Sequence, residues 1–376
     1  MAVRAPRALV LRALGLGDLL TALPALRALR RGLPGWRLTL AVPRAIAPIA
    51  LLGGAADDIF PARGLGPLPP PDGPVELAVN LHGSGPRSHR LLRSLRPGRL
   101  IAFAHPDVPG VDGPAWNPAE HEVARWCRLV AAHGFDADPA DLDLPRPPVA
   151  SPAPGAVVIH PGAGYPSRCW PAERYGAVAA ALRDQGHRVV VTGGAGEAAT
   201  ARRVAVLGGL GPGGDLSGRT GPLELAALVA RARLVICGDT GVAHLATAYR
   251  TPSVLLFGPT PPALWGPPPD RPRHQVLWSG RRGDPRGLEP DPGLLEISPE
   301  HVAEAAARAL ERLEGGTRDE PSARGRDRRG GLPRLAPVRG PAGPRYLGGL
   351  PGQPADGVDP YHRPPAAQER LHVPEA

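Results

Sequence analysis

The stretch ALVLRALGLGDLLTALPALRALRR at residues 8–31 decides the fold of this chain. Residues 8–13 predict a buried strand, because residues 8–11 are a continuous apolar run, and Gly15-Leu16-Gly17-Asp18 predicts a turn. Residues 19–31 predict a helix, because leucines recur there at three- and four-residue spacing. A strand, a glycine turn and a helix in this order open a doubly wound α/β fold, in which ligands bind at the carboxyl ends of the strands.

Asp18 closes the glycine turn and has two interpretations. A carboxylate at a helix N-terminus caps unpaired N–H groups. An acid at the carboxyl end of a strand also points into the ligand crevice, where it could act as a general base. The turn does not match the dinucleotide-binding fingerprint, because Leu20 stands at the third glycine position and no acid follows the second predicted strand. On this segment alone, cap and catalytic base both stay open.

The length of 376 residues exceeds what one hydrophobic core usually serves, so two domains are expected. Residues 1–135 form the first α/β domain, a Rossmann-like one, and residues 136–154 form a linker whose Pro and Asp content disfavours helix and strand. Residues 155–316 repeat the α/β pattern as a second Rossmann-like domain. The expected later strands are 37–42, 76–81, 99–103, 156–160, 188–192, 234–237 and 254–257, and the expected helices are 120–133, 172–185, 223–232, 242–249 and 298–314.

Two expectations concern the C-terminal part. Ser298 as N-cap and Pro299 at the first helical position predict the start of the helix 298–314. The position of this helix stays open, and packing back across the cleft between the domains is one alternative. Residues 317–376 are rich in Pro, Gly and Arg with few large apolar side chains, so we expect a disordered tail.

Composition excludes several functions. All 44 basic residues are Arg, which rules out a P-loop and a lysine Schiff base. The net charge of +9 lies partly in the predicted tail, so nucleic acid is not an expected partner. The three cysteines are far apart, and the Asp141-Leu142-Asp143 carboxylates lie in the linker and not at a strand end, so we expect neither a metal nor a bound cofactor. The chain lacks a signal-peptide core and a membrane span, which predicts a cytoplasmic protein; peripheral contact with the inner membrane face stays open.

The segment from Asp239 to His244 is a candidate anion site. It lies between an apolar strand and a helix, so Thr240 and Gly241 would present N–H groups at a helix N-terminus, and a diphosphate is the ligand that suits this geometry best. The alternative is that Asp239 is an ordinary N-cap and His244 a satisfied core histidine.

Two further loops follow predicted strands. In the first, Gly162, Ala163 and Gly164 precede Arg168, and a glycine-containing loop with a bidentate cation suits phosphate binding. In the second, Glu197 follows a Gly-Gly pair; it could accept hydrogen bonds from ribose hydroxyls, but a glutamate in a first helical turn is also ordinary helix chemistry.

Taken together, these segments resemble glycosyltransferase family 9, the heptosyltransferase family of lipopolysaccharide core assembly. The matching segments occur in family order over roughly residues 8 to 314. They are Leu14–Asp18 with Pro24–Arg30, His160–Ala163 with Trp170-Pro171, Leu216–Thr220, Asp239–Gly241 with His244, and Phe257–Thr260.

The resemblance implies a GT-B architecture in which the N-terminal domain binds the acceptor and the C-terminal domain binds a nucleotide-sugar. It also implies an inverting, metal-independent transfer, with Asp18 as the general base and Gly15 and Gly17 in the acceptor-side loop. Thr240, Gly241 and His244 would hold the donor diphosphate.

Arg168 stands where the family usually has Lys, and Glu197 lies near the position of a ribose-binding acid. The implied function is transfer of a heptose-like sugar to a cell-envelope glycan or glycolipid. Two alternatives remain, a catalytically idle nucleotide-sugar-binding protein and a GT-B nucleotide-sugar epimerase.

Overall fold

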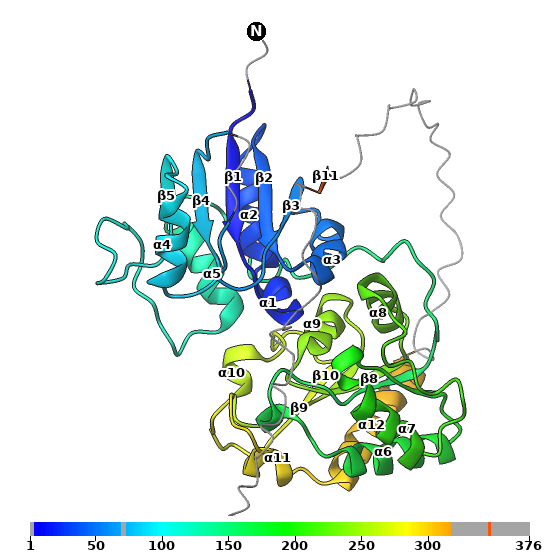
Figure 1. Cartoon of the computed structure of the whole chain (residues 1–376). Coiled ribbons are helices and arrows are strands. Elements are labelled where there is room, and N and C mark those ends of the chain that lie inside the picture. Colours follow the sequence, from blue (N-terminus) through cyan, green and yellow to red (C-terminus); the bar gives the residue numbers. More distant parts are fainter. Residues whose placement is uncertain (1–3, 69–72, 317–344, 347–376) are drawn as a thin grey trace, which may run out of the picture.

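The computed structural model describes residues 4–68, 73–316 and 345–346, and it contains two parallel sheets that carry helices (Figure 1). The strand order of the first sheet is β11-β3-β2-β1-β4-β5, and that of the second is β10-β9-β8-β6-β7. Every pair of neighbouring strands is parallel. The predicted fold class, GT-B with two Rossmann-like domains, is therefore confirmed, whereas the domain boundaries at 135, 154 and 316 stay predictions.

The first sheet and its helices come from the N-terminal part of the chain. The elements are β1 (Arg7–Leu11), α1 (Leu16–Thr21), α2 (Leu23–Gly32), β2 (Arg37–Val42), η1 (Arg44–Ile46), α3 (Ala47–Leu52), β3 (Asp58–Pro61), β4 (Leu77–Asn80), α4 (Arg87–Ser94), β5 (Arg99–Ile101) and α5 (Glu122–Ala131). The single helix predicted for residues 19–31 is wrong, because the chain forms two helices that meet at Ala22. Pro24 lacks an N–H group and therefore suits the first turn of a new helix.

The second sheet and its helices come from the C-terminal part of the chain. Its elements are β6 (Val157–His160), η2 (Pro166–Arg168), α6 (Ala172–Asp184), β7 (Val189–Val191), η3 (Ala195–Glu197), α7 (Ala198–Leu207), α8 (Pro222–Ala230), β8 (Leu234–Gly238), α9 (Gly241–Ala248), β9 (Ser253–Phe257), α10 (Pro262–Trp265), β10 (His274–Trp278), α11 (Pro292–Leu295) and α12 (Pro299–Gly316). Strands β6, β8 and β9 are buried along their whole length, which explains their continuous apolar sequences.

Helix α12 does not pack back across the cleft, so that expectation is wrong. Its apolar residues, among them Val302, Ala306 and Leu310, belong to the same buried cluster as β6 to β9. Gln275 of β10 donates a hydrogen bond to the carbonyl of Ala305 at 2.8 Å. The apolar face of the helix is thus satisfied by its own sheet.

Most of the predicted tail lies outside the described residues. Two of its members, Arg345–Tyr346, form the short strand β11, which pairs with β3. The expectation of disorder for the tail concerns residues that otherwise lie outside the described ones.

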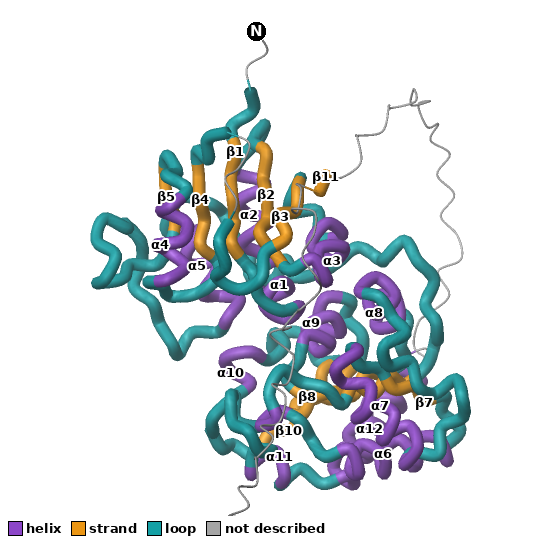
Figure 2. Tube along the Cα trace, viewed as in Figure 1, coloured by secondary structure: helices purple, strands orange, loops and turns teal. Residues whose placement is uncertain are grey.

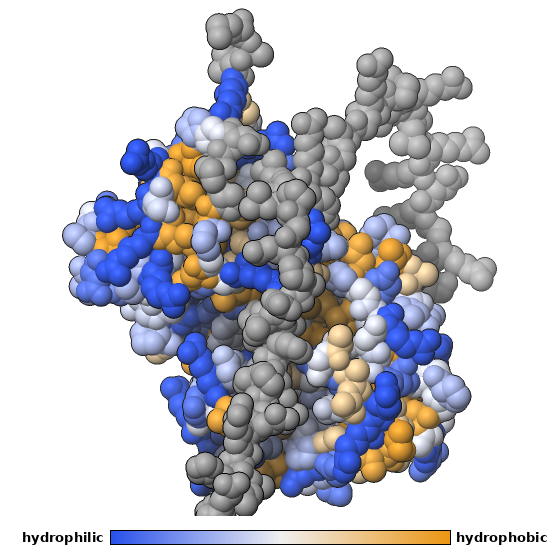
Figure 3. All heavy atoms as spheres, in the orientation of Figure 1, coloured by the Kyte–Doolittle hydropathy of each residue, from blue (hydrophilic) through white to orange (hydrophobic). Residues whose placement is uncertain are grey.

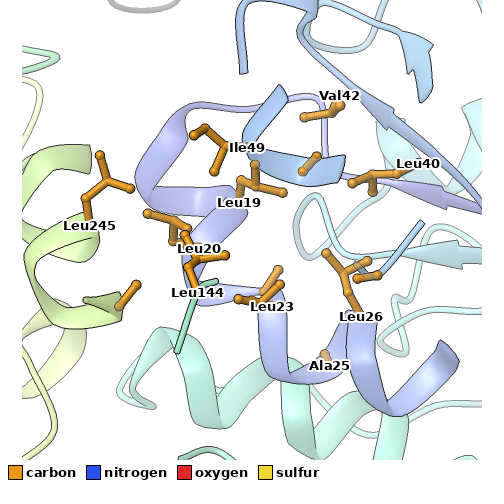
Figure 4. Close-up of a cluster of buried hydrophobic side chains, with 14 of the residues drawn as sticks. Leu19, Leu20, Leu23, Ala25, Leu26, Leu40, Val42, Ile49, Leu144 and Leu245 are labelled. Atoms are coloured by element: carbon orange, nitrogen blue, oxygen red, sulfur yellow. The ribbon is translucent and has the colours of Figure 1, made fainter. Parts of the chain in front are cut away.

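An apolar core joins the two halves of the molecule. Helix α1 lies beside α9 where the two halves meet, and the tube in Figure 2 shows the same arrangement. Leu19, Leu20 and Leu23 belong to one buried cluster with Leu245 of α9, and Figure 4 shows these side chains converging with Leu144. An apolar contact of this kind holds two domains in a defined relation more firmly than a polar one.

The linker is pinned to both halves. Asp141 forms ion pairs with Arg27 and Arg31 of α2 at 2.6 and 2.9 Å. Asp143, two residues later, pairs with Arg250 and Arg271 at 2.8 and 2.9 Å. The two carboxylates that resemble a metal-binding pair in the sequence are therefore occupied by arginines from the two domains.

Candidate active site

Asp18 lies in the first turn of α1, directly after β1. Its Oδ2 accepts a hydrogen bond from the N–H of Gly15, the N-cap residue, at 3.2 Å, so the capping interpretation is confirmed. The side chain keeps 23% of its surface exposed, which leaves the carboxylate accessible as well. Burial raises the pKa of Asp18, the charge of Arg12 opposes this rise, and the charge of Glu122 adds to it. A raised pKa strengthens a carboxylate as a base.

Asp239 occupies the turn between β8 and α9. The N-cap of α9 is Thr240 and not Asp239, so the N-cap interpretation of Asp239 is wrong. Its buried carboxylate instead lies 3.5 Å from the guanidinium of Arg168. Burial raises the pKa of Asp239, and Arg168 opposes that rise. The turn therefore carries a carboxylate and guanidinium pair beside the N-terminus of α9.

Arg168 ends η2 and has unused donor capacity. Its guanidinium carbon lies 5.6 Å from the centre of the Tyr165 ring, and one Nη lies 3.5 Å from Asp239. Its Nε is buried and makes no hydrogen bond within the described part of the chain. A planar fork that is held in place and still has a free N–H group is suited to bind an anion.

Helices α1 and α9 approach each other through two glycines. A Cβ atom placed on Gly241 would lie 2.8 Å from Cβ of Leu16, and one placed on Gly17 would lie 2.9 Å from Cδ2 of His244. His244 also contacts Trp265 edge to face, with ring centres 5.9 Å apart. Burial lowers the pKa of His244 to about 4, so its imidazole is neutral at neutral pH. The two glycines thus allow the turn of Asp18 to lie against the candidate anion site.

Glu197 lies against the loop that follows β6. A side chain at Gly162 would overlap the Glu197 carboxylate, and Nε2 of His160 lies 3.8 Å from it. Glu197 also accepts a hydrogen bond from the N–H of Gly194 at 2.7 Å, so its role in the helix start is confirmed. Ala163 and Gly164 continue this loop toward Arg168, and the carbonyl of Ala163 faces Sγ of Cys169 at 3.9 Å.

The topology explains why these loops meet. Strands β6 and β8 are neighbours, with His160 opposite Cys237, so the loops that follow them leave the same edge of the sheet. The chain order reverses between these two strands, and a reversal of this kind opens a crevice at the carboxyl ends of a doubly wound sheet. Asp18 stands within electrostatic reach of both Arg168 and Asp239. The structure therefore brings most of the predicted site residues together.

The sequence analysis did not identify two buried charged residues near Asp18, namely Arg12 and Glu122. Arg12 is fully buried, and Glu122, the first residue of α5, lies 3.0 Å from it. A charged residue at position 12 inside an apolar strand pattern was an available signal. Glu122 gave none, because it looks like any acid in a first helical turn.

The fold defines a class of protein, namely GT-B proteins with two Rossmann-like domains, and the candidate site lies where the two halves meet. Residues 115–286 match the family model described as glycosyltransferase family 9 (heptosyltransferase). This match covers less than half of the chain, and over residues 115–286 it shows similarity to that family.

Three relatives illustrate the similarity. Lipopolysaccharide heptosyltransferase 3 of Escherichia coli (strain K12) is 36% identical over 113 residues, which are 30% of this chain and 33% of that protein. Lipopolysaccharide heptosyltransferase 1 of Salmonella typhimurium is 26% identical over 300 residues, covering 69% of this chain and 90% of the relative. The solved structure of E. coli ADP-heptose lps heptosyltransferase II has a TM-score of 0.65 at 19% identity, and the match covers 82% of this chain and 99% of that one.

The match to heptosyltransferase 3 spans only a third of the length of that relative. In residues 4–68, 73–316 and 345–346, no three His, Cys, Asp or Glu side chains are grouped so that they could hold a metal ion. Within the same ranges, no helix combines the length and the apolar composition needed to cross a bilayer.

Proposed function

We propose that the protein is an inverting glycosyltransferase that moves heptose or a related sugar from a nucleotide-diphosphate donor to a hydroxyl group of a cell-envelope glycan or glycolipid. ADP-heptose is the first donor to test, because a relative with the same fold carries it in its name. A lipopolysaccharide-type acceptor is favoured for the same reason. The proposal places the protein in the cytoplasm.

One observation carries the proposal. An accessible carboxylate, Asp18, lies near the candidate anion site formed by Arg168 and the N-terminus of α9, at the contact between the two domains. A base on one side and an anion site on the other are the two groups that a sugar transfer needs.

The proposed reaction is a single displacement. Asp18 takes the proton of the acceptor hydroxyl. At the same time, the oxygen of that hydroxyl forms a bond to the anomeric carbon of the donor. The bond from that carbon to the diphosphate oxygen breaks, and the diphosphate leaves with the electron pair. Attack opposite the leaving group inverts the anomeric carbon. The N–H groups at the start of α9, together with Arg168, would stabilise the departing charge.

Metal independence and the absence of a cofactor belong to the proposal. Arg168 and the start of α9 would provide the positive potential that a divalent ion provides elsewhere. Adding EDTA should therefore leave the transfer rate unchanged. A loss of activity that Mg²⁺ or Mn²⁺ restores would contradict this part of the proposal.

A thermal-shift screen against nucleotides and nucleotide-sugars tests the donor, because a ligand that binds only the folded state raises the transition temperature. We expect ADP-heptose to give a shift in the wild type and in Asp18→Asn alike, with transfer lost only in the variant. Binding without transfer by the wild type would favour the idle binding protein, and isomerisation of the donor without an acceptor would favour the epimerase.

We further propose that the acceptor domain contacts anionic lipid through α4. Arg87, Arg90 and Arg93 recur every third residue and are exposed, and the first turn of α4 has no acid. Figure 3 shows hydrophilic side chains on the face of the molecule that carries α4. A basic helix face of this kind is attracted to anionic membrane surfaces.

Vesicle flotation tests this contact. Vesicles with phosphatidylglycerol should retain the wild type at low salt, and the triple variant that changes Arg87, Arg90 and Arg93 to Gln should bind several-fold less. The control is a triple variant of the C-terminal domain that changes Arg202, Arg203 and Arg219 to Gln. Equal retention of wild type and α4 variant would contradict the membrane contact.

A further inference from the structure

A fully buried guanidinium lies directly behind the proposed base. Arg12 follows β1, and its Nε donates to the backbone carbonyl of Asp18 at 2.8 Å. The same side chain donates to the carbonyl of Leu81, and its guanidinium carbon lies 4.7 Å from the centre of the Trp126 ring. Arg12 therefore ties the Asp18 turn to the loop after β4 and to α5.

Arg12 binds the backbone of Asp18 more closely than its carboxylate. The distance from Arg12 Nη2 to Asp18 Oδ1 is 3.5 Å, at the edge of hydrogen-bonding range. The same Nη2 lies 3.0 Å from Oε1 of Glu122. The guanidinium thus fixes the turn while much of its charge is directed to a second acid.

Glu122 is itself a buried, fully engaged carboxylate. Its Oε1 accepts a hydrogen bond from Nε1 of Trp126 at 2.8 Å, and its Oε2 is paired with Arg125. The preceding residue, His121, has its Nε2 3.0 Å from the carbonyl of Gly266 in the C-terminal domain. The start of α5, and with it Glu122, is thereby held in register with both halves of the molecule.

We propose that Arg12 and Glu122 are positioning residues: Arg12 fixes the Asp18 turn, and Glu122 compensates the charge of Arg12 so that the Asp18 carboxylate stays available as a proton acceptor. This inference rests on the proposed function in one respect only, namely that Asp18 is the base. The arrangement of charges can be tested without any assay of transfer.

The other charged and titratable groups near Asp18 are consistent with these roles of Arg12 and Glu122. Arg168 faces it from η2 and Asp239 from the turn before α9. His82 and His244 lie in the field of Arg12, and burial lowers the pKa of each to about 4, so both are neutral near neutral pH. Burial raises the pKa of Asp18, with Arg12 opposing and Glu122 adding to the rise.

The test is a titration of Asp18 by NMR in protein labelled with ¹³C at the aspartate side-chain carboxyl, with the resonance assigned by its absence in Asp18→Asn. Glu122→Gln keeps the size of the side chain and one of its two acceptor oxygens but removes the charge. We expect the pKa of Asp18 to fall by about one unit, the lower end of what a neighbouring charge produces. Arg12→Gln should move the same pKa upward.

Glu120→Gln is the matched control. Glu120 lies two residues earlier and pairs with Arg128 at 2.8 Å, so its loss removes the same charge from the same segment without touching Arg12. The pKa of Asp18 should be unchanged in this variant. An unchanged pKa in a folded Glu122→Gln protein, or shifts of the same sign in the Arg12 and Glu122 variants, would overturn the inference.

The outcome also separates this inference from the proposed function. If the wild type transfers sugar, the acid limb of its kcat profile should move to lower pH in Glu122→Gln, in step with the NMR value. If the NMR shifts occur but the wild type transfers no sugar to any acceptor, the proposed function fails and the arrangement of charges stands.

Discussion

The contact between α1 and α9 predicts a large effect from one methyl group. In Gly241→Ala the new Cβ would lie 2.8 Å from Cβ of Leu16 and 3.1 Å from the backbone nitrogen of Gly17. Carbon atoms pack at about 3.5 to 4.0 Å, so the two helix ends must separate by roughly 1 Å. Overpacking of this kind costs about 1 to 3 kcal/mol. We therefore expect Gly241→Ala to lower the free energy of unfolding by about 2 kcal/mol.

Urea unfolding followed by tryptophan fluorescence measures this loss. Gly83→Ala is the control, because a Cβ at Gly83 meets nothing within 4 Å, and its stability should stay within about 0.5 kcal/mol of the wild type. In a transfer assay, a displacement of about 1 Å between base and donor should lower kcat by roughly 100-fold. If Gly241→Ala were as stable as Gly83→Ala, the close approach of the two helices would be refuted.

Three further predictions follow from single contacts. Arg168→Ala should weaken nucleotide-diphosphate binding by about 1 to 3 kcal/mol in calorimetry, the usual cost of losing a charge-assisted hydrogen bond, and unchanged affinity would place the diphosphate elsewhere. Burial raises the pKa of Asp18 above 3.8, so the folded state loses stability as the pH rises through that raised pKa and Asp18 ionises. The Asp18→Asn variant should therefore be more stable than the wild type at pH 7 and equally stable at pH 3. A gain in stability that persists at pH 3 would contradict this. Trp170→Phe should lower stability by about 1 to 3 kcal/mol, since the buried indole donates to the carbonyl of Ile297 at 3.0 Å, and a loss below 0.5 kcal/mol would refute it.

The sequence predicts the two-sheet fold because the central strands are continuous apolar runs. The predicted strand at residues 37–42 matches β2 residue for residue, and the predicted helix at 172–185 ends one residue beyond α6. The sequence does not predict β3 or β10. β3 is only four residues long, and four of the five residues of β10 are only partly buried, so neither carries a strong apolar signal.

The candidate site is predictable only where it is local in the chain. Asp18 and Asp239 follow strands, and a strand end is visible in a single segment. Glu122 reaches Arg12 across 110 positions, and no periodic pattern encodes a contact over that separation. The same holds for α12: its apolar face shows that it packs, but the face does not show which sheet receives it.

The two carboxylates at the domain contact differ in exposure and in their partners, and this difference supports the roles that we propose for them. Asp239 is buried, and its carboxylate interacts with Arg168 and Thr260, so it holds the guanidinium against the turn. Asp18 is more exposed, and its nearest guanidinium, Arg12, is shared with Glu122. Neighbouring acids whose surroundings differ in this way commonly divide structural and catalytic work. The more exposed acid, Asp18, is therefore the one that we propose exchanges a proton with a substrate.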